Sequence, residues 1–476
     1  MLGGALVAAL PLFLTSCEDI FGEWDRPMAQ TSPAKTEGTI SFAETSFLKC
    51  SKDPVVTFTN PLTLTGDGAV SYESSNTAVA TVDATGKVTI AGPGTTTIKA
   101  KVSDTDTYTY ATNEASYTLE VQDGYSYMKW DGTAQKLVSD IETNYQEVSS
   151  STTTWDGSKV LVVKDPDVSI TSDITLSGNT TIILCDGAKL TTKQINGNDV
   201  GNYHSLTIYG QSAQTGKLIA HPDNGGAITM IQELHVHGGD IEAIGGTTYS
   251  GVKLAGDPKT INVYGGKLTA RGSSYDGIYD CNAINILGGT VEATSGGSGR
   301  YGINMSSPSI ITVSNDGRLK AVGGDGSSVD GGNGVIGTLV AKDNAVVEVY
   351  GGHATSGGHS GGYGISNGDV EIHDNARVTC VAGNSSGTNN GNDAIPNHVY
   401  YHGGTLIAIG GAKGDSGTKD GKGIGYFLTN SSGGTIYYAT NTDGSLTTFP
   451  SIATMLSTDL AKDFSTDNYR GIKVYK

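Results

Sequence analysis

The sequence predicts an all-β protein in which a β-sandwich is followed by a right-handed parallel β-helix. Glycine accounts for 68 of the 476 residues and charged residues for only 16%, and so little charge is atypical of a disordered chain. Short alternating apolar runs, separated by turns, fill residues 39–122. Farther along the chain, one apolar pattern recurs about every 27 residues, which is typical of coils that stack on one another.

The charge and the cysteines exclude several classes of function. A formal net charge of −18 argues against binding to nucleic acid and against electrostatic docking on anionic lipid. The same negative charge disfavours a polyanionic substrate, unless bound cations bridge the protein and the substrate. The spacing of the cysteines fits neither a zinc site nor a disulfide scaffold: Cys17, Cys50, Cys185, Cys281 and Cys380. We therefore expect no cofactor, apart from the calcium considered below.

The N-terminal segment predicts export. Residues 5–14 form an apolar stretch too short to span a bilayer, and it runs directly into Leu14-Thr15-Ser16-Cys17. This tetrapeptide resembles the lipobox of bacterial lipoproteins, which implies a signal peptide over residues 1–16 and a lipid on Cys17. The acidic stretch EDIFGEWD that follows resembles the surface-export signal of Bacteroidetes lipoproteins. These resemblances imply a protein anchored to the outer membrane by lipid alone and facing outward, with residues 17–38 as a tether.

Residues 39–122 read as a β-sandwich. Val79–Val82, Lys87–Ile90 and Thr96–Ala100 are predicted strands, and a glycine ends or begins each intervening turn. The segment resembles the bacterial Ig-like group 2 domain through Ser74, Ser75, Asn76, Val79, Ala80, Val82, Gly86, Val88, Gly94, Ile98 and Ala100. In that family the domain occurs in surface adhesins and as a spacer in secreted carbohydrate-active proteins. We expect the spacer role here.

The recurring unit reads apolar-x-apolar-x, a tight turn, and then x-apolar-x-small. Clear copies begin at Leu234, Ile261, Ile284, Ile311, Leu339, Val370 and Val399, and weaker copies at Ile182 and Leu206. The residue before each turn forms a ladder along the predicted stack: Cys185, Tyr209, His237, Tyr264, Leu287, Ser314, Lys342, His373 and His402. Because one unit cannot bury its own apolar face, it must stack on its copies.

Each predicted coil has three short strands, one corner and one variable loop. The corner is Gly-Gly or an Asn/Asp turn such as Asn315-Asp316-Gly317, and these residues tolerate left-handed backbone angles. A variable Gly/Ser loop follows, and a third strand then begins at a pair such as Gly251-Val252 or Gly277-Ile278. Three short strands per coil predict a parallel β-helix over residues 166–430.

Both ends of such a rod need to be covered. We expect residues 123–165, which include Trp130 and Trp155, to form a linker and an N-terminal cap. Residues 431–476 are the expected C-terminal cap. Within it, apolar residues spaced four apart between Phe449 and Phe464 predict a short amphipathic helix.

Two sets of residues resemble chemical sites, but the fold explains them better. Cys380 occupies the small inward position that alanine fills in other coils, so a buried free thiol is expected: Ala243, Ala270, Ala293, Ala321 and Ala408. His237, His373 and His402 share a ladder position with Leu, Ser, Lys and Tyr. We therefore interpret them as solvated strand ends, and a metal stripe is the less favoured alternative.

Aromatic residues precede the third strand in several coils. Tyr249, Tyr275, Tyr301 and Tyr363 each lie one or two residues before the Gly-Val or Gly-Ile pair. They predict an aromatic strip on which sugar rings of a polysaccharide or host glycan stack, and packing within the protein is the alternative. Two arginines in the same loops, Arg271 and Arg300, are candidates for pairing with acidic sugars.

Other chemistry is less well supported by the sequence. Asp325 and Asp330 offer oxygen ligands for calcium, although solvated turns are the favoured interpretation. The glycine-rich coils are similar to those of carbohydrate-binding β-helix proteins of gut and cellulolytic bacteria, which implies a surface lipoprotein that binds glycans without catalysis. The alternatives are a polysaccharide lyase or glycoside hydrolase, and a purely structural surface protein.

Overall fold

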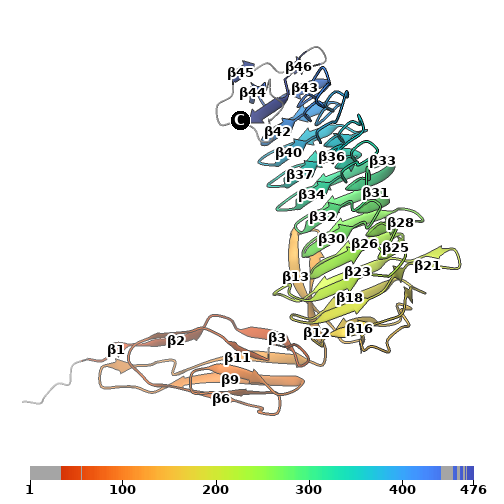
Figure 1. The fold of residues 1–476 in the computed structure, drawn as a ribbon. Helices are drawn as coiled ribbons and strands as arrows, with labels where there is room; N and C mark the ends of the chain where they lie inside the picture. Colours follow the sequence, from red (N-terminus) through yellow and green to blue (C-terminus); the bar gives the residue numbers. More distant parts are fainter. Residues whose placement is uncertain are drawn as a thin grey trace, which may run out of the picture.

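The computed structural model describes residues 34–54, 56–440, 454–457, 461–464, 467 and 469–475. Within these residues the regular elements are all strands, and they form an Ig-like β-sandwich followed by a parallel β-helix (Figure 1). The predicted fold class is confirmed. The signal peptide, the lipidated Cys17 and most of the tether lie outside the described residues.

The Ig-like domain packs a four-stranded sheet, β3-β11-β9-β6, with the three-stranded sheet β4-β8-β7 and two smaller pairs, β2-β5 and β1-β10. Val88, Ile98 and Leu119 meet in its core because alternate residues of each strand face inward. The strands are β1 (Thr36–Glu37), β2 (Thr39–Phe42), β3 (Ser46–Cys50), β4 (Thr57–Thr59), β5 (Leu62–Thr65), β6 (Val70–Ser74), β7 (Ala80–Val82), β8 (Lys87–Ile90), β9 (Gly94–Val102), β10 (Tyr108–Thr109) and β11 (Glu114–Gln122).

A β-hairpin follows the Ig-like domain and packs along the side of the β-helix. Its strands are β12 (Tyr125–Asp131) and β13 (Lys136–Glu142). Tyr127 packs on Tyr209 with ring centroids 4.5 Å apart, and Trp130 stacks on Tyr264 at 5.7 Å. The hairpin therefore runs across the turns of successive coils (Figure 1) and does not cap the end. The aromatic turn residues supply the apolar surface that holds the hairpin on the coils. The rest of the expected linker and cap, residues 123–165, does lie at the first coil, where Tyr145–Glu147 begins a sheet and Trp155 is buried in the core.

One face of the β-helix is a sheet of short parallel strands, each at the same position of its coil. Antiparallel strands from the C-terminal segment complete this sheet. In order across the sheet they are β16 (Val168–Ile170), β19 (Lys189–Thr192), β24 (Lys217–Ala220), β27 (Asp240–Ile244), β30 (Lys267–Arg271), β32 (Thr290–Thr294), β34 (Arg318–Val322), β37 (Val346–Tyr350), β40 (Arg377–Val381), β42 (Thr405–Ile409), β47 (Gly471–Tyr475), β44 (Thr435–Ala439) and β45 (Thr454–Ser457).

The other two faces merge into one long sheet, because β31 and β33 run continuously around a corner. A small hairpin, β21 (Asn198–Asp199) and β22 (Asn202–Tyr203), projects beside them. The strands of this sheet are β14 (Tyr145–Glu147), β15 (Val160–Val163), β17 (Ile174–Thr175), β18 (Thr180–Leu184), β20 (Ile195–Asn196), β23 (Leu206–Gly210), β25 (Ile228–Ile231), β26 (Glu233–Val236), β28 (Val252–Leu254), β29 (Thr260–Val263), β31 (Ile278–Ile286), β33 (Ile303–Val313), β35 (Val335–Ile336), β36 (Thr338–Ala341), β38 (Ile365–Ser366), β39 (Val370–Ile372), β41 (Val399–Tyr401), β43 (Phe427–Asn430) and β46 (Ala461–Asp463).

The register confirms the repeat at its clear copies and corrects it at the first weak one. Leu206, Leu234, Ile261 and Ile284 pair in succession and are fully buried. In the preceding coil, however, Ile183 is the partner of Tyr209, so the ladder begins at Ile183 instead of Cys185. Residues 181–184, with the sequence TIIL, carry apolar side chains on both faces of the strand. The sequence therefore does not determine which of two registers, one residue apart, this strand adopts.

The predicted buried thiol is confirmed. Cys380 pairs in register with Ala408 and is fully buried and unpaired, as are the other three described cysteines. Burial raises the pKa of the Cys380 thiol, which keeps it protonated.

The Asn/Asp corners adopt the expected left-handed backbone. Asn315, Asp343 and Asp374 have φ of 52°, 57° and 56°. Their side chains also join the coils, because Asp343 accepts a hydrogen bond from the Asn315 amide at 2.9 Å and Asp374 one from the Asp343 amide at 3.0 Å.

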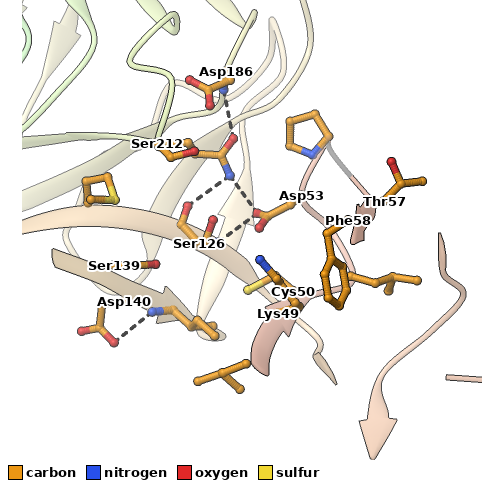
Figure 2. Close-up of a pocket in the computed structure, with 16 residues that line it drawn as sticks. Lys49, Cys50, Asp53, Thr57, Phe58, Ser126, Ser139, Asp140, Asp186 and Ser212 are labelled. Carbon is orange, nitrogen blue, oxygen red and sulfur yellow. Dashed lines mark hydrogen bonds between the residues drawn. The ribbon is translucent and has the colours of Figure 1, made fainter. Parts of the chain in front are cut away.

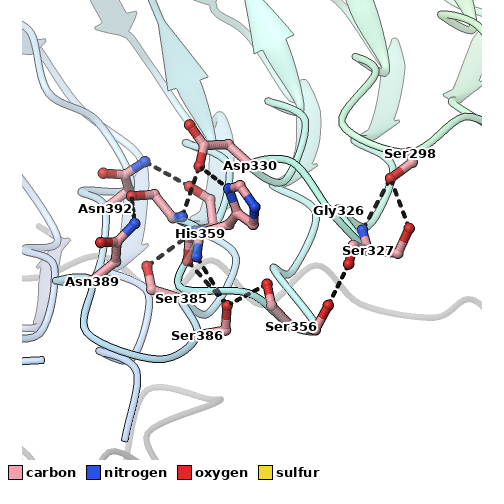
Figure 3. A network of polar contacts seen from close by, with 12 residues as sticks. Ser298, Gly326, Ser327, Asp330, Ser356, His359, Ser385, Ser386, Asn389 and Asn392 are labelled. Carbon is pink, nitrogen blue, oxygen red and sulfur yellow. Dashed lines mark hydrogen bonds and ion pairs between the residues drawn. The ribbon is translucent and has the colours of Figure 1, made fainter. Parts of the chain in front are cut away.

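The glycine-rich loops are packed, not free. Backbone hydrogen bonds join the glycines of neighbouring loops into one row. The amide of Gly332 donates to the carbonyl of Gly324, that of Gly352 to Gly332, and that of Gly362 to Gly352, each at 2.8 Å. A Cβ at any of these glycines would overlap a neighbouring backbone. Serines add further hydrogen bonds between the loop tips (Figure 3), where the Ser327 amide donates to the Ser298 hydroxyl at 3.0 Å.

The C-terminal end is covered by antiparallel strands. β47 pairs with β42, and β46 pairs with β43, so the last parallel strand of each sheet is covered by an antiparallel strand. The amphipathic helix predicted between Phe449 and Phe464 is wrong for the described part of that segment, which forms β45 and β46. Hydrogen bonding to the sheet edges favours strands in this segment over the helix that the apolar spacing predicted. Phe464 is nevertheless buried in the core.

Candidate functional site

The third strand of each coil positions the candidate site. Val252, Ile278 and Ile303 pair in register and face the core. The residues after them, Lys253 and Tyr279, pair with each other and face outward, because side chains alternate along a strand.

A second row lies beside the first. Tyr249, Tyr275 and Arg300 occupy the same position on successive coils, two residues before the glycine that opens each third strand. The two rows enclose a cavity of about 300 Å³, which we call the aromatic cavity, lined by Gly226, Thr229, Thr248, Tyr249, Ser250, Lys253, Tyr275 and Tyr279.

Aromatic rings and cations are in direct contact in the aromatic cavity. Tyr275 and Tyr279 meet edge to face with centroids 5.4 Å apart. Lys253 Nζ lies 5.5 Å from the Tyr279 centroid, and the Arg300 guanidinium lies 4.2 Å from the Tyr275 centroid. Tyr249 is 45% exposed, so one wall of the cavity is an accessible aromatic surface.

Arg300, which stacks on Tyr275, borders a second cavity farther along the same loops. This polar cavity, of about 440 Å³, is lined by Ser298, Gly299, Arg300, Tyr301, Val329, Asp330, Gly331, Asn333, Gly361, Tyr363 and Asn392. The structure thus divides the four predicted tyrosines between two cavities, with Tyr249 and Tyr275 in one and Tyr301 and Tyr363 in the other. Arg271 is exposed at the end of β30 and lines neither cavity.

Buried polar side chains fix the backbone of these loops. Asp276 is fully buried and accepts hydrogen bonds from the Tyr301 amide at 2.8 Å and from Asn304 Nδ2 at 3.0 Å. Burial raises the pKa of Asp276, and these two donors act against that rise. Asn333 repeats the arrangement by accepting from the Tyr363 amide at 2.9 Å. Both tyrosines are therefore held in place through their main chains.

Two residues of the aromatic cavity, Lys253 and Tyr279, were missed in the sequence. The predicted aromatic strip contains only residues that precede the Gly-Val and Gly-Ile pairs, whereas these two follow the pairs. The alternation of side chains along a strand identifies both residues, because the residue after a buried Val252 or Ile278 must face outward.

The calcium candidates are engaged in bonds between loops. Asp325 accepts from the His353 amide at 2.7 Å, and Asp330 accepts from the Ser360 amide at 2.8 Å. Asp330 also lies 3.5 Å from His359 Nδ1 (Figure 3). Among the described residues, no group of three or more His, Cys, Asp or Glu side chains is placed to hold a metal ion. These contacts favour the structural interpretation of both carboxylates.

The histidine ladder is only partly solvated. His237 is buried between Tyr209 and Tyr264, with centroid distances of 4.6 and 4.3 Å, and its Nδ1 accepts the Trp130 amide at 3.0 Å. Burial, with a smaller effect of His235, lowers the pKa of His237 to about 3. The expectation of a solvated row is therefore wrong for His237. His373 and His402 stack on each other at 4.4 Å and are more accessible.

A third cavity, of about 450 Å³, lies where the Ig-like domain meets the hairpin and the first coils (Figure 2). Asp53 accepts hydrogen bonds there from the Ser126 amide at 2.9 Å and from Gln211 Nε2 at 2.8 Å. Gln211 also donates to the Ser126 carbonyl and accepts from the Asp186 amide. We call these residues the Asp53 joint, because they connect the domain, the hairpin and two coils.

Fold and site together define an Ig-like and β-helix protein with two cavities along its loops. A family model described as the intimin immunoglobulin-like domain matches residues 62–107. Intimin of Escherichia coli O157:H7 is 36% identical over 86 residues, which cover 18% of this chain and 9% of that protein. Intimin of Escherichia coli O111:H- is 34% identical over 86 residues, with the same coverage.

These comparisons support the Ig-like domain alone. The chain spans about a tenth of the length of the curated relatives it matches, as the 9% coverage shows, and the family match ends at residue 107, before the β-helix. No solved structure gives a significant match. Among the described residues, no helix is long and apolar enough to cross a membrane.

Proposed function

We propose that this protein is a lipid-anchored bacterial surface protein that binds a polysaccharide or host glycan along the loops of its β-helix. The aromatic cavity is the observation that carries the proposal. It presents the partly exposed Tyr249 and the ring of Tyr275 beside polar groups, which is the combination that sugar rings need for stacking and hydrogen bonding.

The other parts of the chain fit this function. The Ig-like domain spaces the β-helix from the membrane, and the lipobox-like sequence at Cys17 provides the anchor. The resemblance of the Ig-like domain to domains of surface adhesins supports an outward-facing location. The partner is a glycan, and the acidic chain has no features that suit nucleic acid.

Binding is favoured over cleavage because the two cavities supply few catalytic groups. Their lining residues include one carboxylate, Asp330, and it is engaged by His359 and by the Ser360 amide. Glycoside hydrolysis ordinarily needs two carboxyl groups flanking the scissile bond.

The test is a glycan array probed with the purified protein, followed by incubation with the polysaccharides that bind. We expect binding without new reducing or unsaturated ends. Absence of binding across a broad plant and host panel contradicts the proposal. New chain ends would instead show that the protein is a hydrolase or lyase.

A further inference from the structure

Two cations contact the tyrosine rings of the aromatic cavity: Lys253 lines the cavity, and Arg300 stacks on Tyr275. Among the described residues, neither Lys253 nor Arg300 forms an ion pair, and each lies over a tyrosine ring instead. Lys253, Tyr279, Tyr275 and Arg300 thus form one continuous chain of contacts, with a cation at each end. A stacked guanidinium keeps its N–H groups free at the edge of its plane.

The neighbouring carboxylates are already satisfied. Asp280, the nearest acid to Tyr279 along the chain, binds Lys259 Nζ at 2.7 Å and accepts a hydrogen bond from Ser306. Burial acts to raise the pKa of Asp280, but the bonds from Lys259 and Ser306 outweigh it and lower that pKa. Asp276 is buried beneath the loop and is bound by Tyr301 and Asn304. The accessible charge at the cavity is therefore positive, in a chain whose net charge is −18.

We propose that the aromatic cavity selects a glycan that carries an isolated carboxylated sugar, whose ring packs on the tyrosines while Lys253, the cation that lines the cavity, holds its carboxylate. This inference rests on the proposed function and adds the ligand class. Lysine attracts a carboxylate as a compact point charge with three hydrogen-bond donors. An isolated acid fits better than a polyanion, because the net charge of the whole chain repels closely spaced negative charges.

Matched oligosaccharide pairs test the inference by calorimetry with the full chain. One pair is 3′-sialyllactose and lactose, and the other is a xylo-oligosaccharide with and without a single glucuronate branch. In at least one pair we expect the acidic member to bind about tenfold more tightly, which is the scale of one charge-assisted hydrogen bond. The pair that shows the difference distinguishes a host sialoglycan from a plant glucuronoxylan.

A variant assigns the effect to Lys253. Lys253→Gln is expected to remove most of the preference for the acidic member. Lys320→Gln is the matched control, because Lys320 is exposed on β34. Thermal unfolding of both variants shows whether each is folded.

The possible results distinguish failure of this inference from failure of the proposed glycan binding. Equal binding of acidic and neutral members, or a preference that survives Lys253→Gln, overturns the inference and leaves glycan binding in place. Failure of both acidic members to bind, while neutral glycans bind on the array, also overturns it. Absence of binding to every glycan overturns both.

Discussion

His237 shows how a single side chain attaches the hairpin to the β-helix. It is buried between Tyr209 and Tyr264, and its neutral ring accepts the Trp130 amide through Nδ1. A protonated ring would lose this acceptor and place a charge among aromatic rings. The pKa of about 3 follows mainly from burial and means that the folded protein keeps His237 neutral in mildly acidic solution.

This low pKa predicts a loss of stability on acidification. The unfolded chain binds a proton at His237 below about pH 6.5, whereas the folded chain does not until about pH 3. The free energy of unfolding therefore falls as pH decreases through this window, by up to about 1.4 kcal/mol per pH unit from this residue. In thermal unfolding between pH 7 and pH 4, His237→Asn should lose less stability than the unmodified protein. If the two proteins lose equal stability between pH 7 and pH 4, His237 does not have this role.

At the scale of elements, the glycine-rich loops behave as part of the β-helix core. Their two sides alternate in one hydrogen-bonded row, and each glycine faces a backbone carbonyl of its neighbour. The rigid loops hold Tyr301 and Tyr363 through their amides, so the candidate site is largely preformed.

The packing of the loops predicts that alanine is not tolerated there. A Cβ at Gly383 would overlap the carbonyl of Gly352, so Gly383→Ala should destabilise the β-helix by about 2 kcal/mol or more. Gly132→Ala is the control, because no atom lies within 4 Å of its added Cβ, and its effect should stay within about 0.5 kcal/mol. Denaturant unfolding measures both variants. A Gly383→Ala variant as stable as the control would mean that the loops are open.

The sequence predicted the coils well because their signal is local and repeated. Apolar alternation placed Leu234, Ile261 and Ile284 in one buried row, and the Asn/Asp corners were recognisable from their backbone preference. The hairpin and the C-terminal strands were not predictable in the same way. Their positions depend on contacts with distant residues, such as Trp130 with Tyr264 and β47 with β42.

The candidate site was predicted in part. Tyr249 and Tyr275 were identified from their place before the third strand, and they do share a cavity. The division of the four tyrosines between two cavities was not evident, because Tyr301 and Tyr363 lie one residue nearer to the strand than Tyr249 and Tyr275. A shift of one residue changes the direction of a side chain, and spacing in a variable loop does not specify it.

At the scale of the whole molecule, the Asp53 joint sets the direction in which the β-helix is presented. Asp53 lies after β3 in the Ig-like domain, and its partners belong to the hairpin and to a coil turn (Figure 2). Burial raises the pKa of Asp53, while its hydrogen bonds to Ser126 and Gln211 act in the opposite direction. The contact between the domains therefore includes a partly buried carboxylate that is held by hydrogen bonds from the hairpin and from a coil turn.

Removal of this carboxylate should loosen the two domains. Asp53→Ala removes the acceptor of the Ser126 amide and one of the two acceptors of Gln211 Nε2, so small-angle scattering should report a broader distribution of distances than in the unmodified protein. Asp106→Ala, at an exposed position of the Ig-like domain, is the control. Identical scattering from Asp53→Ala and the control would show that the joint is held by other contacts.

The central claim is that the β-helix binds glycans through its aromatic cavity. Its most direct test is the affinity of Tyr275→Ala for the glycan identified on the array, with Tyr426→Ala as the control. Tyr426 is 49% exposed and lines neither loop cavity. The account predicts that Tyr275→Ala binds at least about fivefold more weakly while Tyr426→Ala binds normally, because a ring that stacks on a sugar contributes on the order of 1 kcal/mol or more. Unchanged affinity in a folded Tyr275→Ala protein would contradict the account.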